Sequence, residues 1–216
     1  MRRLWGCSGV TNDGMVPLTD PVNTAVGGMG GHLLRRSIHL GMCAIPWAVY
    51  VHGGRAADLL GLADVAQVVS AFVLLVVLAE ALRLRFGITV FGQREYEATQ
   101  VSALAWGAVA IGVVLLALPE AKFGAPLILS LAFGDPLLGE LRRAGRSPKT
   151  VFVTGTVVLL MVWVGCVVWL GTPWLLAVVL PPLCVAAEWP RLRWIDDNAT
   201  MLLLPLMAVM LLSPWL

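Results

Sequence analysis

One transition from apolar to basic sequence organises the chain: Ser130-Leu-Ala-Phe-Gly-Asp-Pro-Leu-Leu-Gly-Glu-Leu-Arg-Arg-Ala-Gly-Arg-Ser-Pro-Lys149. The stretch leaves an apolar run and then brings an aspartate, a glutamate and four cations into a short, flexible loop. The sequence around it is apolar, since 59% of the 216 residues are hydrophobic and only 13% are charged. A soluble domain has roughly 25% charged residues. The chain has too little polar surface for a soluble globule, which predicts an integral membrane protein.

The apolar segments are continuous and do not alternate, which predicts helices and not a barrel. One span needs roughly 20 helical residues, or fewer where it lines a cavity. We therefore expect an all-α, polytopic protein with about seven transmembrane helices, at residues 37–52, 64–82, 101–118, 123–138, 151–171, 173–187 and 199–215. Prolines in two of these segments predict a break or bend in 123–138 and a kink in 173–187.

Residues 1–31 are rich in glycine and have no hydrophobic periodicity. They predict a disordered N-terminal tail, followed by one transmembrane helical-bundle domain at 32–216. No apolar core follows Arg2 and Arg3 closely enough for a signal peptide. A start at Met29, with 1–28 an over-called extension, is a hypothesis that N-terminal sequencing of the native protein tests.

The charges indicate an orientation. If the N-terminus is cytoplasmic, 13 of the 15 Lys and Arg residues fall in the inner segments 1–36, 83–100, 139–150 and 188–198. Such a bias supports seven spans and a multi-pass integral membrane protein, which in a bacterium would lie in the inner membrane. No basic tract suits nucleic acid. The cysteines show no CxxC spacing and are expected to be small buried hydrophobes.

The carboxylates gather on the same face, which topology alone does not require. These acids lie at or near the inner ends of spans: Glu80, Glu95, Glu97, Asp135, Glu140, Glu188, Asp196 and Asp197. The outer loops are short and almost featureless. We therefore expect any chemistry to be cytoplasmic.

Three short constellations each have an ordinary alternative. Arg35-Arg36-Ser-Ile-His39 is also typical of a positive flank, although Arg35 and His39 share a helix face. Glu80-Ala-Leu-Arg83 also fits an interfacial ion pair. Arg94-Glu95-Tyr-Glu97 also fits a solvated helix start with acids near the helix dipole. None of the three establishes a site by itself.

Two acidic positions favour function. Asp135 is costly this close to a membrane unless it is paired or binds an ion, although Gly134-Asp135-Pro136 could simply begin a turn. Asp196-Asp197-Asn198, which follow Glu188, could cap a helix, but a cap uses only one of them. Three consecutive oxygen donors suit a hard cation such as Mg²⁺ better.

Clustered carboxylates for Mg²⁺, an arginine-rich loop for phosphates and an apolar bundle together suggest phosphoryl or nucleotidyl transfer to a membrane-embedded substrate. Such transfer needs alignment and charge neutralisation more than covalent chemistry from the protein. The sequence has no GxxxxGK[ST] phosphate loop and no protein-kinase glycine loop. A nucleotide would therefore be bound by another scheme.

The order of these motifs resembles the dolichol kinase and phytol kinase family over about residues 32–207. The resemblance rests on Arg35-Arg36-x-x-His39, Glu80-x-x-Arg83, Arg94-Glu95, Phe133-Gly-Asp135-Pro, Lys149-Thr, Gly155-Thr156, Glu188, Asp196-Asp197-Asn198 and Pro205. It implies a reaction in which the γ-phosphate of CTP moves to the hydroxyl of a long-chain isoprenoid alcohol of the polyprenol, dolichol or phytol type. It also implies a divalent cation, Mg²⁺.

The resemblance also implies roles for individual residues. Metal ligands are Asp135, Glu188, Asp196 and Asp197. Nucleotide or phosphate contacts are Arg36, Arg142, Arg143, Lys149 and Asn198. Catalytic residues are Asp135, Asp197 and His39, and the rest of the polar site is Glu80, Arg83 and Glu95. The chain departs from the family pattern after Asp135, where Gly139-Glu140 comes early and no glutamate precedes Gly155.

Two other functions stay open. A membrane cytidylyltransferase that makes a CDP-lipid would share CTP, Mg²⁺ and a lipid substrate, but the chain lacks the Lys-Asp…Asp-Arg ending of phosphatidate cytidylyltransferases. A transporter or non-catalytic membrane protein is less favoured, because mid-span positions are almost all apolar. The general base is open between a carboxylate and His39. The sequence indicates neither the alcohol nor the oligomeric state.

Overall fold

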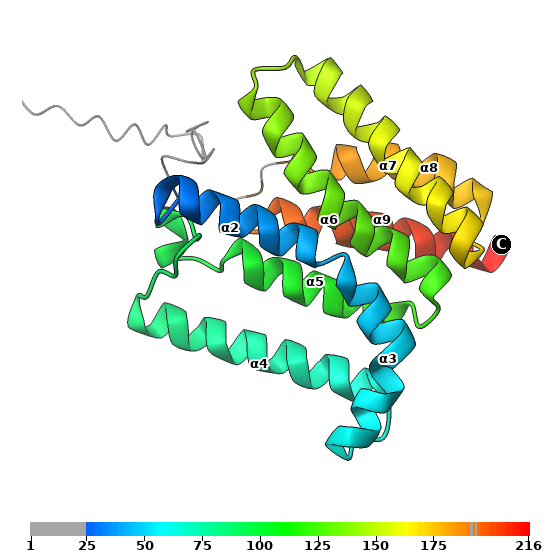
Figure 1. The fold of residues 1–216 in the computed structure, drawn as a ribbon, viewed down its shortest axis with the longest axis horizontal. Coiled ribbons are helices and arrows are strands. Elements are labelled where there is room, and N and C mark those ends of the chain that lie inside the picture. The colour runs from blue at the N-terminus through cyan, green and yellow to red at the C-terminus, as the bar shows by residue number, and fades with distance from the viewer. Residues whose placement is uncertain (1–24, 191, 193) are drawn as a thin grey trace, which may run out of the picture.

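The structure, a computed structural model, describes residues 25–190, 192 and 194–216. In these ranges the regular elements are α-helices and two short 3-10 helices. The pairing of extended backbone found there is one isolated antiparallel bridge between Ala25 and Arg94. The predicted all-α class is confirmed. Figure 1 shows the helices side by side in one bundle.

The elements follow the predicted order of apolar segments. They are α2 (Gly28–Gly41), α3 (Ala44–Leu60), α4 (Val65–Phe86), η1 (Glu95–Ala98), α5 (Ala103–Ala117), α6 (Ala121–Arg143), α7 (Pro148–Leu170), α8 (Trp174–Ala187), α9 (Asp197–Leu212) and η2 (Ser213–Trp215). Four stretches of the described chain are long and apolar enough to cross a membrane, namely α4, α6, α7 and α9 with η2. Helices α5 and α8 are apolar but shorter.

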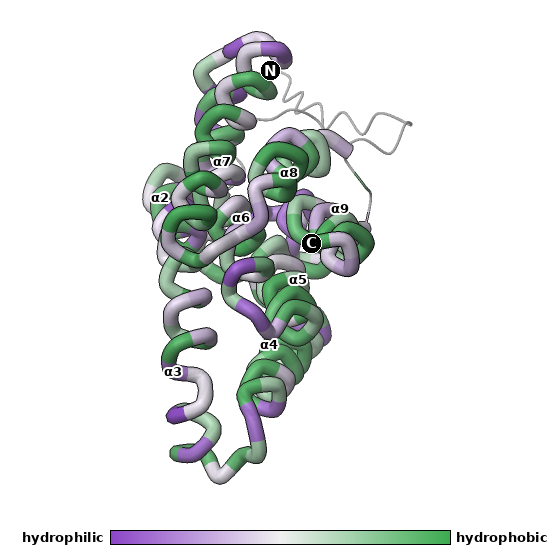
Figure 2. Tube along the Cα trace, turned by 90° about the vertical axis from the view of Figure 1, so that its right-hand side faces the viewer, coloured by the Kyte–Doolittle hydropathy of each residue, from purple (hydrophilic) through white to green (hydrophobic). Residues whose placement is uncertain are grey.

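Helix α6 lies at the centre of the bundle. It packs against α2, α3, α5, α7, α8 and α9, and about half of its residues are buried. Helix α4 lies at the edge, where it packs against α3 and α5 and buries only Val69, Glu80 and Arg83. Figure 2 shows how much of the bundle is hydrophobic along its length. An outer helix with an apolar exposed surface is what contact with lipid requires.

The predicted first span, 37–52, is not one helix. It crosses a break at Met42 and Cys43, where α2 ends and α3 begins. Pro46 explains the break, because its ring lacks an N–H and clashes with the carbonyl of Met42, four residues earlier. The amide of Ile45 bonds the Met42 oxygen at 3.0 Å instead, which closes a tighter turn.

A break in 123–138 is wrong, whereas the alternative bend there and the kink in 173–187 stay predictions. Helix α6 continues through Pro126 and Pro136, and α8 continues through Pro181 and Pro182. Pro126 leaves the carbonyl of Lys122 without its helical donor, and the hydroxyl of Thr172 donates to that oxygen at 2.7 Å. A side chain from the α7–α8 connection therefore replaces the missing backbone bond.

Helix α6 also extends to Arg143, so Asp135 and the residues up to Arg143 lie in a helix and not in the expected flexible loop. The expected disordered tail is wrong for residues 25–31. Ala25 pairs with Arg94, and α2 begins at Gly28. The remainder of that tail, residues 1–24, lies outside the described residues.

The polar connections gather at one end of the bundle. In Figure 1 the start of α2 and the connections α4–α5, α6–α7 and α8–α9 lie on the left or upper left. The connections α3–α4, α5–α6 and α7–α8 lie on the right. From α3 onward successive helices thus alternate in direction, and the segments that contain most of the residues singled out in the sequence meet at the left end.

Candidate functional site

Three carboxylates from different helices meet at this end of the bundle. Asp135 of α6, Glu188 after α8 and Asp197 of α9 each offer one oxygen, and these oxygens lie within 4.8 Å of one another. We call these three residues the carboxylate cluster. Asp135 and Glu188 are almost fully buried, and Asp197 is half-buried.

Helix phase places Asp135 in the cluster. Leu131 and Leu138, four residues before it and three after, are fully buried in the core. Residues at these spacings share a helix face, so Asp135 points inward with them. The short connection from the end of α8 to Asp196 then brings Glu188 and Asp197 to the same point.

Two arginines compensate the charge of the cluster. Arg36 of α2 donates through Nη1 to Oδ2 of Asp135 at 3.0 Å and to its backbone oxygen at 3.3 Å. Arg142 forms a two-pronged ion pair with Glu188, with both bonds at 2.8 Å. Its guanidinium also lies 5.1 Å from the Trp189 ring centre. Bidentate pairs of this kind fix the direction of the carboxylate as well as its charge.

His39 lies beside the cluster. Its Nδ1 is 3.3 Å from Oδ2 of Asp135, without hydrogen-bond geometry, and its side chain is buried. Further out on α2, His32 contacts Glu140 Oε1 at 3.0 Å, and Nε of Arg36 lies 3.5 Å from the same oxygen. Glu140 therefore links α2 to the last turns of α6.

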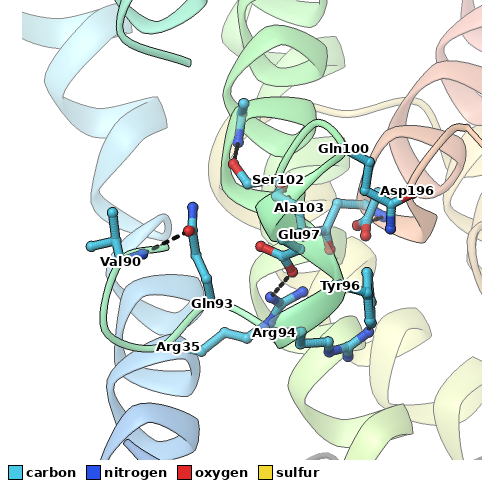
Figure 3. A network of polar contacts seen from close by, with 12 residues as sticks. Arg35, Val90, Gln93, Arg94, Tyr96, Glu97, Gln100, Ser102, Ala103 and Asp196 are labelled. Atoms are coloured by element: carbon cyan, nitrogen blue, oxygen red, sulfur yellow. Dashed lines mark hydrogen bonds and ion pairs between the residues drawn. The ribbon is translucent and has the colours of Figure 1, made fainter. Parts of the chain in front are cut away.

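A second polar network anchors the segment between α4 and α5. Arg83 donates to both oxygens of Glu80, at 2.8 and 2.9 Å, and to the backbone oxygens of Ile88 and Gln100. From this segment Glu97 reaches Arg35 of α2 at 3.0 Å, as Figure 3 shows. Glu97 is 1% exposed, and its Oε2 has no hydrogen-bond partner.

A small basic pocket lies between α2 and this segment. It is lined by Ala25, His32, Arg35, Arg36, Gly92 and Arg94. Arg36 belongs both to this lining and to the contacts of Asp135, so the pocket adjoins the carboxylate cluster.

Burial changes the protonation of acids at the site. Burial raises the pKa of Glu188 to about 8, and the charges of Asp135 and Asp197 act in the same direction against the lowering effect of Arg142. Burial, and then Asp197, also raise the pKa of Asp196 well above its ordinary value. Both shifts favour the protonated carboxyl as long as no further positive charge is present.

The pKa of Arg94 is raised although burial opposes the charged form. Tyr96, Asp197 and Asp196 outweigh that opposition. The guanidinium donates to the hydroxyl of Tyr96 at 2.6 Å. Figure 3 shows Arg94 and Tyr96 on the segment before α5, with Asp196 at the start of α9 nearby. Arg94 is therefore a fixed cation that faces the acidic start of α9.

Several residues expected at the site meet there. The structure brings together Asp135, Glu188 and Asp197, and it places Arg36, Arg142 and His39 against them. Asp196 has a different position from these three, because it caps α9 by accepting the N–H of Asn198 at 3.1 Å. The side chain of Asn198 donates to the backbone oxygen of Ala103, while its own amide oxygen has no partner.

Other expected residues lie apart from the cluster. Glu80 and Arg83 pair with each other in the anchor of the α4–α5 segment. Arg143 and Lys149 are exposed near the α6–α7 connection, and Arg143 reaches only Glu140, at 3.4 Å. Glu95 is exposed in η1, whereas Glu97, two residues on, is buried.

The predicted site residues do not include His32, Arg35, Arg94 and Glu97, although the last three stand in motifs quoted from the sequence. Their contacts join segments far apart in the chain, such as Arg35 and Glu97, which are 62 residues apart. The available signal was local: His32, Arg35 and Arg36 recur at helical spacing, so they share one face of α2.

The donor set of the cluster fits a hard divalent cation. All three groups are carboxylates, with no nitrogen or sulfur donor among them, and Mg²⁺ prefers such oxygen ligands together with waters and phosphates.

Comparisons with protein-family models, with curated proteins and with solved structures found no match to this chain.

Proposed function

We propose that the chain spans the membrane seven times, with α2 and α3 together as the first span and the carboxylate cluster on the cytoplasmic side. The alternating direction of the helices supports this arrangement. Helix α2, the ends of α4, α6 and α7 and the connections at the cluster's end also carry most of the Lys and Arg residues that the structure describes, as cytoplasmic segments do.

We propose that the protein is a kinase of lipid alcohols. One observation carries the proposal: three carboxylates, two of them paired with arginines, meet at the polar end of an apolar helix bundle. Such a site would offer groups suited to a cation and to phosphates near the hydroxyl of a membrane alcohol. CTP as the donor, and a long-chain isoprenoid alcohol as the acceptor, rest on the resemblance to the dolichol and phytol kinases.

In this proposal Asp135, Glu188 and Asp197 hold Mg²⁺, which when bound neutralises charge on the phosphates. Arg36 and Arg142 keep two of these carboxylates oriented. The oxygen of the alcohol bonds to the γ-phosphorus of CTP, and the bond from that phosphorus to the CDP oxygen breaks. His39, beside Asp135, accepts the proton of the hydroxyl.

The test uses purified full-length protein in detergent with Mg²⁺ and a panel of polyprenol, phytol and diacylglycerol, together with phosphatidate, whose phosphate a CDP-lipid-forming enzyme needs as acceptor. CTP is labelled either at the γ-phosphate or in the cytidine. We expect the γ-phosphate label, and no cytidine label, in one of the lipids. Cytidine in the lipid would identify the alternative CDP-lipid-forming reaction. No label in any lipid of the panel would contradict an enzyme of either kind.

A further inference from the structure

The basic pocket beside the carboxylate cluster is built from two segments that hydropathy alone would not join. His32, Arg35 and Arg36 lie on one face of α2, and Gly92 and Arg94 come from the segment after α4. All of the side chains among them that carry charge are cationic or can become so. The pocket therefore has the electrostatic character of an anion site.

Close contact between backbones holds the pocket in shape. The amide of Val26 donates to the oxygen of Gln93 at 2.8 Å, and the amide of Gly92 donates to the oxygen of Val26 at 3.0 Å. Gly92 has a φ of +90°, and its Cα packs against Gly31. A side chain on either glycine would collide with the backbone of a neighbouring segment. Val26 before α2 and Gly31 within it therefore hold the segment of Arg94 against α2.

Three of the four basic side chains of the pocket contact a carboxylate, and Arg94 is the fourth. His32 has Glu140, Arg35 has Glu97 and Arg36 has Asp135. Arg94 donates to the neutral hydroxyl of Tyr96, and no carboxylate of the described chain lies within 4.0 Å of its guanidinium. A half-buried guanidinium with no close acid is available to an anionic ligand.

The orphaned nitrogen of Arg36 points to the same conclusion. Its Nε is buried and makes no hydrogen bond, since Glu140 Oε1, at 3.5 Å, is too poorly placed to accept one. Buried guanidinium donors are normally satisfied, so this atom indicates a missing acceptor. Phosphate oxygens are acceptors that several arginines can share.

We infer that the basic pocket binds phosphate groups through Arg35, Arg36 and Arg94, next to the carboxylate cluster. This inference deepens the proposed function, because it assigns the phosphates of the substrate to the α2 side of the cluster. The resemblance also implied Arg36 and Asn198 as such contacts, but it placed the remaining ones on Arg142, Arg143 and Lys149. Arg142 is engaged by Glu188, and the other two are exposed. The phosphates could belong to the nucleotide or to a phosphorylated lipid.

The experiment measures binding to the purified full chain, with a chelator present so that no cation contributes. The probes are inorganic tripolyphosphate, which stands for the nucleotide, and a polyprenyl monophosphate in the detergent micelle. Arg94→Gln is compared with Arg85→Gln, which removes an exposed arginine at the end of α4. We expect Arg94→Gln to weaken one probe by about tenfold or more and Arg85→Gln to change neither by more than about twofold.

The probe that Arg94→Gln weakens identifies the source of the phosphate. Equal binding of both probes to the wild type and the Arg94→Gln variant would overturn the inference. If that variant does not fold, Arg94→Lys replaces it, since lysine keeps the charge and loses the planar fork; wild-type binding by the lysine variant and by a folded Arg35→Gln variant would again overturn it. The assay needs no turnover, so binding that depends on Arg94 would survive failure of the kinase proposal.

Discussion

At the scale of single residues, Asp135 is the carboxylate that lies between the basic side chains of α2 and the other two acids of the cluster. Its Oδ2 lies close to both Arg36 and His39, while two further carboxylates approach within 4.8 Å. A buried charge that loses its partner typically costs 3–5 kcal/mol, an order-of-magnitude value for such pairs. The aspartate is therefore held in place by its cations, and a divalent ion would add to them.

The raised pKa of Glu188 leads to the first prediction, which is that cation binding depends on pH. Its pKa, raised to about 8, must fall when a cation binds, so binding releases a proton below pH 8. The apparent affinity for Mg²⁺ should rise by up to roughly tenfold per pH unit between 6 and 8 and level off above. Without a cation, the same shift makes the folded state lose stability as pH rises from the ordinary carboxyl range toward 8.

Calorimetric titration with Mg²⁺ in two buffers of different ionisation enthalpy measures that proton release. At pH 6.5 we expect release of about one proton per ion bound. An affinity that does not change between pH 6 and 8, with no proton released, would show that Glu188 is already ionised or is no ligand.

At the scale of elements, small residues on helix α6 let side chains of neighbouring helices come close to it at the site. Gly139 lies under the guanidinium of Arg36, and a Cβ at this position would overlap it. Because the obstacle is the end of a flexible side chain, the helix can accept alanine while Arg36 moves away from Asp135. A substitution of Gly139 by alanine should therefore lower the activity without lowering the stability.

We predict that Gly139→Ala keeps or raises the melting temperature, since alanine in a helix is favoured over glycine by roughly 1 kcal/mol. Lipid phosphorylation should fall about tenfold or more, the order expected for losing one charged hydrogen bond. Gly54→Ala is the control, because a Cβ there meets open space on α3. Equal activity of the two variants would contradict a role for the contact between Arg36 and Asp135.

Hydropathy predicted most helices of this fold within a few residues, because long apolar runs need no information from elsewhere in the chain. It failed where the outcome depends on a distant partner. The carbonyl that Pro126 leaves free is satisfied by Thr172, 50 residues from that carbonyl, so α6 does not break. Conversely, the local effect of Pro46 splits the first predicted span although its hydropathy is continuous.

The candidate site was predictable to a similar extent. Acids at the ends of apolar spans stand out in the sequence, so Asp135, Glu188 and Asp197 could be singled out, but so was Asp196, which caps α9. Whether Glu95 or Glu97 turns inward depends on the phase of a four-residue 3-10 helix, which the sequence pattern does not fix. The partners of the carboxylates depend on packing between helices, and local spacing does not contain that information.

At the scale of the whole molecule, the number of spans decides which faces the loops occupy. With seven spans, residue 58 and residue 146 lie on opposite sides of the membrane. With only the four long apolar stretches as spans, both lie on the same side. Asp58 and Arg146 are exposed, so each position can report its own side.

We predict that cysteines at these two positions, in a chain without its native cysteines, react with a membrane-impermeant maleimide from opposite sides. Asp58→Cys should be labelled in right-side-out vesicles and Arg146→Cys in inside-out vesicles. Labelling of both from the same side would exclude the seven-span arrangement.

The carboxylate cluster is the centre of the proposed function, and neutral variants of its acids test it most directly. Transfer of γ-labelled phosphate from CTP to the lipid alcohol is measured for Asp135→Asn and Asp197→Asn beside Asp58→Asn, an exposed acid on α3. We predict no detectable turnover for the first two, with membrane insertion intact, and wild-type turnover for the third. Wild-type turnover in Asp135→Asn or Asp197→Asn would remove that residue from the site and contradict the account.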